Sequence, residues 1–429
     1  MDYQNSLRYL NSFLNLEQTP KPHSRIWNLK RMRELLTLFH HPEKRLFTVI
    51  IGGTKGKGST GYFLSEILRQ SGFRVGFYHS PHLESPNERI WINGRPVSES
   101  DFAQGLSAVR KRLRKIGDGS LFPKKTKKIE PSPFFFAATY FEILTLLACL
   151  LFKEKKVDVA LFEVGMGGRL DATHVLPAKL AILTPIHYDH EAYLGNTLTE
   201  IASEKAAIIV PGRDVVTAPQ EPEVRRVIQK VAGKRKSPLH PPLKRKGMHL
   251  KLLGDFQELN ARTALRAARI LRDRYWFPVT EKAMDQGISG NHWPGRMELF
   301  KRKPAILLDG AHNPKSIEAL VRNVGRLYPR KRKILIFGTS RDKKTDRMLP
   351  LLARVFQTVI LTRSQTPRAK EIASLLSEAR PYFSTLIPAA SSREALVLAR
   401  RRARPGDLIV GTGSFYLVGE LRSLCRKSI

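Results

Sequence analysis

The feature that most constrains this chain is an apolar strand that runs into a glycine-rich loop and then into a helix. The apolar run is Leu46–Ile51, the loop reads GGTKGKGST over residues 52–60, and apolar residues then recur at helical spacing. Glycines allow backbone N–H groups to turn toward an anion, and a helix N-terminus adds positive partial charge. We therefore predict a nucleoside triphosphate site in which Lys57 reaches the β- and γ-phosphates. The alternative is a plain glycine-rich turn.

The spacing of this loop differs from the strict G-x-x-x-x-G-K-[ST] pattern. One residue fewer precedes the glycine–lysine pair, and Gly58 separates Lys57 from the hydroxyl side chains. Ser59 or Thr60 offers a hydroxyl close to a phosphate-bound metal. The predicted nucleotide-binding residues of the loop are Gly53, Thr54, Gly56, Lys57, Gly58, Ser59 and Thr60, with Ser59 also a predicted metal ligand.

β-branched runs alternate with longer helical patterns along the whole chain, which predicts α/β folding on mainly parallel sheets. The expected strands are Leu46–Ile51, Arg74–Tyr78, Val157–Glu163, Leu180–Thr184, Asp214–Thr217, Ala305–Asp309, Lys333–Phe337, Thr358–Leu361 and Asp407–Val410. The expected helices are Gly58–Ser71, Glu99–Lys115, Pro133–Lys153, Leu198–Val210, Phe256–Arg272, Pro314–Leu327 and Arg393–Ala403. The glycine- and proline-containing segment GISGNHWPG (287–295) predicts a boundary between two domains, 1–292 and 293–429.

Composition narrows the class of protein. Of the 429 residues, 42% are hydrophobic and 26% charged, which excludes a largely disordered chain. Two cysteines exclude a disulfide framework. The formal net charge is +36, but the basic clusters are scattered over the whole length. Such a charge attracts polyanions of any kind, or is a solvated basic surface without a dedicated partner.

One apolar stretch, residues 134–152, is long enough to cross a membrane. Glu142 lies near its centre, and a carboxylate there is costly in lipid, so we expect a buried helix of a globular domain. The first residues lack the basic-then-apolar order of a signal peptide. We expect a cytoplasmic protein without membrane association.

Several further segments occur in a fixed order. They are HSPHL (79–83), ERI (88–90), ING (92–94), YFEILT (140–145), FEVGMGGRLDAT (162–173), DH (189–190), IASEKA (201–206), FQELNA (256–261), WPGRME (293–298), DGAHNP (309–314) and GSFYLVG (413–419). Together with the loop, they resemble the folylpolyglutamate synthase and dihydrofolate synthase family of the Mur ligase superfamily. The resemblance implies a P-loop, Mur-ligase-like ATP-binding domain with the folate site, followed by a smaller Rossmann-like α/β ligase domain.

Glu163 closes the apolar strand VDVALFE at its carboxyl end, where open α/β sheets place ligands, and a carboxylate there suits Mg²⁺. A surface glutamate at a strand end is the alternative. The resemblance implies that Ser80 and His190 bind the same metal or a second one, so two Mg²⁺ ions are expected. It also implies a carbamylated Lys205, which requires a neutral amine and hence a depressed pKa.

The resemblance implies a role for four more residues. Asn260 would read adenine, Arg296 would reach the phosphates, Asp309 would contact ribose, and His312 would lie near the γ-phosphate and the incoming amino acid. With Lys57 and Lys205, His312 completes the predicted catalytic group.

The implied activity is an ATP-dependent ligation of L-glutamate to dihydropteroate, to tetrahydrofolyl-polyglutamate, or to both, through an acyl phosphate. We expect a monomer that acts on these small molecules and has no nucleic-acid partner. Two alternatives stay open: a Mur-type amino-acid ligase acting on a nucleotide-linked sugar, and a basic P-loop NTPase that binds nucleic acid.

Overall fold

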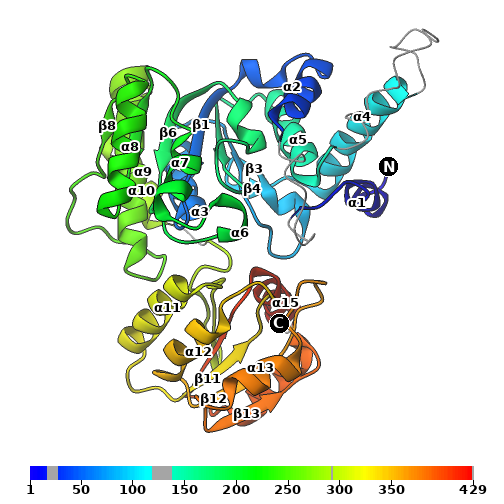
Figure 1. Cartoon of the computed structure of the whole chain (residues 1–429), viewed down its shortest axis with the longest axis vertical. Helices are drawn as coiled ribbons and strands as arrows, with labels where there is room; N and C mark the ends of the chain where they lie inside the picture. The colour runs from blue at the N-terminus through cyan, green and yellow to red at the C-terminus, as the bar shows by residue number, and fades with distance from the viewer. Residues whose placement is uncertain (17–27, 118–137, 291–292, 428–429) are drawn as a thin grey trace. The chain divides into compact units, whose positions relative to one another are not determined.

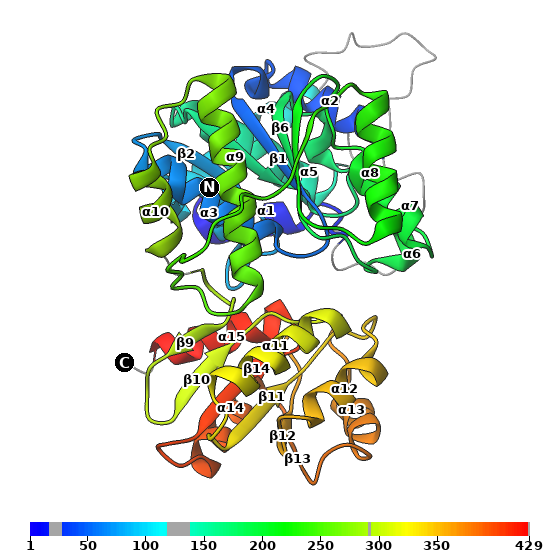
Figure 2. The ribbon, with the colours of Figure 1, turned by 90° about the vertical axis from the view of Figure 1, so that its left-hand side faces the viewer.

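The computed structural model describes residues 1–16, 28–117, 138–290 and 293–427. It contains two compact units, each assembled from stretches that are not contiguous in sequence (Figures 1 and 2). The first unit comprises Met1–Ser80, Asn87–Gly247 and Leu259–Ile288, and the second comprises Pro81–Pro86, Met248–Glu258 and Ser289–Ile429. The assignment of functions to residues 1–292 and 293–429 stays a prediction. The basic cluster at 124–128 and the expected helix start at 133–137 lie outside the described residues.

The first unit is built on an eight-stranded sheet with the order β4-β3-β2-β5-β1-β6-β7-β8. Adjacent strands from β2 to β8 in this order are parallel, while β3 pairs antiparallel with both β2 and β4. The strands are β1 (Phe47–Gly52), β2 (Val75–Tyr78), β3 (Ile90–Ile92), β4 (Arg95–Pro96), β5 (Val159–Glu163), β6 (Ala178–Leu183), β7 (Asp214–Thr217) and β8 (Leu239–His240).

Helices cover both faces of this sheet because its central strands are buried on both sides. The helices of the unit are α1 (Tyr3–Asn11), α2 (Leu29–Leu38), α3 (Lys57–Gln70), α4 (Glu99–Gly117), α5 (Tyr140–Glu154), α6 (Glu191–Leu194), α7 (Leu198–Ala206), α8 (Pro222–Lys234), α9 (Phe256–Tyr275, from Leu259 onward) and α10 (Glu281–Ser289, to Ile288), with 3₁₀ turns η2 (Pro42–Arg45), η3 (Pro86–Arg89, from Asn87 onward) and η5 (Ala172–Val175). Successive side chains of β5 point to opposite faces of the sheet. Ala160 and Phe162 pack with α1, α2, α4 and α5 in one apolar cluster.

Helix α5 contains the apolar run whose centre carries Glu142. The carboxylate of Glu142 accepts a 2.7 Å hydrogen bond from Nε of Arg31 and another from the backbone N–H of Thr139, which caps the helix. Arg31 and Glu142 are both buried. Burial of a charge requires such a partner, so the expected buried helix is confirmed. Among helices in the described ranges, none combines the length and apolarity needed to cross a bilayer.

The second unit is built on a six-stranded sheet with the order β13-β12-β11-β14-β10-β9, parallel except for β9. Its strands are β9 (Glu298–Phe300), β10 (Ala305–Leu308), β11 (Lys333–Phe337), β12 (Thr358–Leu361), β13 (Thr385–Pro388) and β14 (Leu408–Thr412). Its helices are α11 (Pro314–Leu327), α12 (Thr345–Ala353), α13 (Ile372–Ala379), α14 (Ser392–Arg402) and α15 (Phe415–Lys427). Apolar side chains from α11, α12 and α13 form one core cluster, and those from α14 and α15 form another. The expected α/β fold with two mainly parallel sheets is confirmed.

Candidate active site

The phosphate loop lies between the end of β1 and the start of α3. Helix α3 begins at Lys57, one residue before the expected start, and Gly56 precedes it in the left-handed conformation, with φ of 85°. The backbone N–H of Thr60 donates to the carbonyl of Gly56 across 2.8 Å. The earlier N–H groups of the first turn have no helical acceptor, so they are available to an anion. Ser59 and Thr60 are buried at this helix start.

Lys57 faces Glu163 across the sheet edge. The Lys57 Nζ and the Glu163 Oε1 are 3.8 Å apart, and the two side chains are 15% and 5% exposed. Glu163 is the last residue of β5 and is in register with Ile51 of β1. The separation exceeds a hydrogen bond. The two opposite charges therefore share a partly buried site without close contact.

The loop after β6 is fastened to the phosphate loop. The backbone N–H groups of Thr54 and Lys55 donate to the carbonyl of Pro185 at 3.0 and 3.2 Å, and the Thr54 hydroxyl donates to the carbonyl of His187 at 3.1 Å. His190 follows in this loop in a left-handed conformation, with its Nε2 3.8 Å from the Asp189 carboxylate. These bonds hold the segment that carries His190 beside the phosphate loop.

The four predicted metal-binding positions follow strands that are neighbours in the sheet. Ser80 follows β2, Glu163 ends β5, Ser59 belongs to the loop and helix after β1, and His190 follows β6. The order β2-β5-β1-β6 is parallel, so these carboxyl ends share one edge.

The donor types at this edge suit Mg²⁺ in part. One carboxylate and two hydroxyls are oxygen donors of the kind that Mg²⁺ takes together with substrate phosphates. The imidazole of His190 is a nitrogen donor that Mg²⁺ uses less often. Within the described ranges, no group of three or more His, Cys, Asp or Glu side chains forms a metal cluster.

Lys205 is buried on α7, directly behind the phosphate loop. Its Nζ donates to the carbonyl of Gly53 across 3.2 Å, and its residue exposure is 3%. Burial lowers the pKa of this amine to about 7, and the neighbouring positive charge of Lys57 acts in the same direction. A substantial fraction of the amine is therefore neutral near neutral pH.

Asn260 lies on α9 against the phosphate loop. A methyl group placed on Gly56 would come within 2.3 Å of the Asn260 Oδ1. Asn260 is 4% exposed. The structure therefore brings this amide to the start of α3, although the two residues are far apart in sequence.

Three predicted residues belong to the second unit. Asp309 follows β10, and its two carboxylate oxygens accept backbone N–H groups from Met297 and Ala311, each at 2.9 Å. Burial raises the pKa of Asp309, and the nearby Arg296 opposes that rise. The Nδ1 of His312 is 2.8 Å from the carbonyl oxygen of Gly310. Asp309 thus orders the turn that carries His312.

Two residues were given no role by the sequence analysis. Phe415 lies under the guanidinium of Arg296, 4.4 Å from ring centroid to Cζ, and its ring is 5.5 Å from that of His312. Asp171 accepts backbone N–H groups from Gly165 and Met166 and so shapes the loop after Glu163. Both lie in segments quoted for the resemblance, GSFYLVG and GGRLDAT, and that was the only signal available.

The sequence of this chain is similar to those of known proteins. Residues 295–415 match the family described as Mur ligase, glutamate ligase domain. A dihydrofolate synthase/folylpolyglutamate synthase of Bacillus subtilis is 30% identical over 419 residues, covering 92% of this chain and 94% of the relative.

Solved structures give the same result. A Mycobacterium tuberculosis folylpolyglutamate synthase complexed with ADP aligns with a TM-score of 0.86 at 28% identity, covering 99% of each chain. E. coli FolC in complex with DHPP and ADP aligns with a TM-score of 0.80 at 27% identity, covering 100% of this chain and 98% of that one.

Proposed function

The chain belongs to the folylpolyglutamate synthase and dihydrofolate synthase family, and from that membership we propose that it joins L-glutamate to a pterin-linked carboxylic acid at the expense of ATP. The acceptors are dihydropteroate and folyl-polyglutamate, and we take the enzyme to be bifunctional, using both. The observation that carries the proposal is Lys57, held 3.8 Å from Glu163 at the start of α3.

The chemistry begins with the carboxylate of the pterin substrate. Its oxygen attacks the γ-phosphorus of ATP, the bond to the β-phosphate oxygen breaks, and ADP leaves. The product is an acyl phosphate, whose phosphate is a far better leaving group than the oxygen of a carboxylate. The neutral amine of glutamate then attacks the carbonyl carbon, loses a proton, and expels inorganic phosphate to leave an amide.

The residues of the first unit would bind and orient the triphosphate. The first-turn N–H groups of α3 and the amine of Lys57 would contact its oxygens and offset the charge of the transferring group. Asn260, placed against Gly56, would read the base or hold the loop. Thr54, bonded to His187, fixes the loop that these contacts require.

Mg²⁺ is the expected companion of ATP, and Glu163, Ser59, Ser80 and His190 would hold it. When bound, it would polarise the phosphoryl oxygens and orient the triphosphate. Carbamylation of Lys205 would convert a buried amine into an anion by addition of CO₂ and loss of a proton. Its lowered pKa, about 7, supplies the neutral amine that this addition needs.

Within the second unit, Arg296 and His312 would act on the transferring phosphate and the incoming glutamate. Phe415 would orient both, because it contacts each of them. Each carboxylate oxygen of Asp309 already accepts one backbone N–H, from Met297 or Ala311. To contact ribose, Asp309 would accept a hydroxyl hydrogen bond through a lone pair that these two bonds leave unused. The monomeric state and the cytoplasmic location stay predictions.

The test is an ADP-release assay with glutamate present and with dihydropteroate or tetrahydrofolate added separately, the products being resolved by mass. We expect ADP release to require both glutamate and a pterin acid, and Lys57→Ala to reduce it by at least about 100-fold. Lys179→Ala, a lysine within β6, is the matched control and should retain activity. ADP release stimulated by RNA, or dependent on a nucleotide-linked sugar, would instead favour one of the two alternatives. Glutamate incorporation undiminished in Lys57→Ala would refute the proposal.

A further inference from the structure

The parallel sheet of the first unit has a second edge, at the amino ends of its strands, opposite to the edge that carries the phosphate loop. Six connections enter the parallel strands at this edge, and five of them, all except the one before β6, carry an exposed cation. Arg45 precedes β1, Arg74 precedes β2, Lys156 precedes β5, Arg213 precedes β7 and Lys236 precedes β8. We call these five residues the basic edge. Cations that are far apart in the sequence thus lie along one edge of the sheet. The sequence analysis expected no nucleic-acid partner.

The basic edge is not neutralised by its own carboxylates. In the described part of the chain, no ion pair joins any of its five cations to a carboxylate. The acids nearby have other partners: Asp158 accepts the backbone N–H of Arg74 at 2.7 Å, and Asp214 pairs with His240 at 2.7 Å. Cations in a last α-helical turn, such as Lys153 and Lys234, complement the helix dipole. The basic edge lies outside the α-helices, although Arg45 ends the 3₁₀ turn η2.

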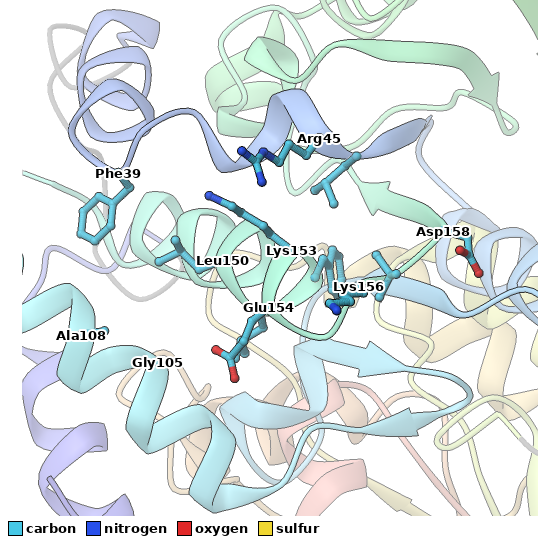
Figure 3. Close-up of a pocket in the computed structure, with 13 residues that line it drawn as sticks. Phe39, Arg45, Gly105, Ala108, Leu150, Lys153, Glu154, Lys156 and Asp158 are labelled. Carbon is cyan, nitrogen blue, oxygen red and sulfur yellow. The ribbon is translucent and has the colours of Figure 1, made fainter.

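A depression of about 680 Å³ opens at the same edge. Arg45, Lys153 and Lys156 line it together with apolar residues such as Phe39 and Leu150, and Figure 3 shows both Arg45 and Lys153 reaching over it. Glu154 also lines it, 3.9 Å from Lys155. Asp158 lines it too, so three cations and two carboxylates surround the depression and leave a small net positive charge there. An anion would be attracted to that charge.

An exposed tryptophan accompanies the cations. Trp276 follows α9 in a left-handed conformation, with φ of 60°, and is 86% exposed. Its neighbours are firmly held: the Tyr275 hydroxyl donates to the carbonyl of Lys179 at 2.7 Å, and the Phe277 ring stacks on that of Phe73 at 4.7 Å. Phe73 directly precedes Arg74, and Lys179 is near the start of β6, so the indole projects from the same edge.

We propose that the basic edge, with Trp276, binds single-stranded nucleic acid. Adjacent strands lie about 4.8 Å apart, so cations spread over six strands form a row roughly 24 Å long. A row of cations follows a phosphate backbone, and a fixed exposed indole stacks on a base of any sequence. A membrane surface fits less well, because a single indole among cations buries little apolar area.

The test is fluorescence anisotropy of a labelled oligouridylate titrated with the full-length protein at several salt concentrations. The edge variant is Arg45→Glu, Arg74→Glu and Lys156→Glu combined. Its matched control is Arg393→Glu, Arg401→Glu and Arg404→Glu combined, three exposed arginines of the second unit. Each triple changes the net charge by the same amount, from +36 to +30, since each substitution removes two charges and 36 − 6 = 30.

We expect the edge variant to bind at least about tenfold more weakly than the control, with the salt slope reduced by about 0.7 for each lost phosphate contact. Trp276→Ala should also lose about tenfold, and Trp276→Phe should recover part of it, because stacking needs only an aromatic face. Ligase activity should be unchanged in all these variants, which shows that they fold. Equal losses in the two triples would overturn the proposal, since net charge alone would then explain binding. So would an effect of Trp276→Ala on phosphatidylglycerol vesicles but not on oligouridylate.

Discussion

The amine of Lys205 donates a hydrogen bond to the carbonyl oxygen of Gly53, the residue that opens the turn of the phosphate loop. This bond connects α7 to the nucleotide site through a lysine that is almost wholly buried. It places an amine of unusually low pKa at the back of the loop, and that pKa has a measurable consequence.

We predict that Lys205→Met reduces the pH dependence of stability. The pKa of this lysine is about 7 in the folded chain and 10.5 in its ordinary state. Between these values the unfolded chain binds more protons, so the free energy of unfolding of the wild type should rise with pH. The difference between wild type and variant should grow by on the order of 2–4 kcal/mol over that interval. Urea unfolding below pH 7 and near pH 10, in CO₂-depleted buffer, measures it. Parallel curves for the two proteins would contradict the low pKa.

We predict that Gly56→Ala weakens ADP binding at least tenfold. The new methyl group would meet the Asn260 Oδ1 at 2.3 Å, and φ of 85° is unfavourable for alanine. Gly72→Ala is the control, because Gly72 has a similar φ of 87° but open space around it. It should cost only about 1 kcal/mol of stability and leave nucleotide affinity unchanged. Isothermal titration with ADP measures both variants. Adding Asn260→Ala to Gly56→Ala, with Asn260→Ala alone as the reference, separates the steric contribution from the backbone one.

We predict that Phe415→Leu lowers kcat about three- to tenfold with little change in KM for ATP. The aromatic face that confines Arg296 would be lost, and such cation–π contacts contribute about 0.5–2 kcal/mol. Phe383→Leu, a substitution in the core of the same unit, should leave kcat unchanged. Steady-state kinetics of both variants measure the difference. A rise in KM without loss of kcat would mean that Phe415 binds substrate and does not orient Arg296.

We predict that Arg422→Met destabilises the chain by about 3–5 kcal/mol. The Nε of Arg422 donates to both carboxylate oxygens of Glu298 at 3.0 Å, and the Glu298 side chain is 2% exposed, so the variant would leave a buried charge without a cation. Glu84, the second partner of Arg422, is 24% exposed. Glu84→Gln should therefore cost at most about 1 kcal/mol. Thermal unfolding of the full chain compares the two, and equal costs would refute this account.

The sequence predicted most of the central buried strands and missed the short edge strands and several helices. Buried strands such as Val159–Glu163 and Lys333–Phe337 appear within two residues of their expected bounds. The short edge strands Arg95–Pro96 and Leu239–His240 have too few residues to show a period. Helix Pro222–Lys234 was missed although its buried residues Val224, Ile228 and Ala232 recur at helical spacing.

The candidate site was also predictable only in part from the sequence. Glu163 could be placed because it ends a recognisable strand, and the order of neighbouring strands then decides what lies beside it. The approach of Asn260 to Gly56, and the position of Phe415 under Arg296, depend on tertiary packing that no local pattern encodes. The gathering of Arg45, Arg74 and Lys156 at one edge depends on topology in the same way.

Residues 81–86 belong to the second unit although the chain on both sides of them belongs to the first. Leu83 packs so closely on α15 that any side chain at Gly419 would collide with its carbonyl oxygen, and Glu84 reaches Arg422 in the same helix. During synthesis these two residues emerge long before the helix that receives them. No single scission of the polypeptide can therefore release the second unit intact, and residues 81–86 can take their place in it only after α15 has been synthesised.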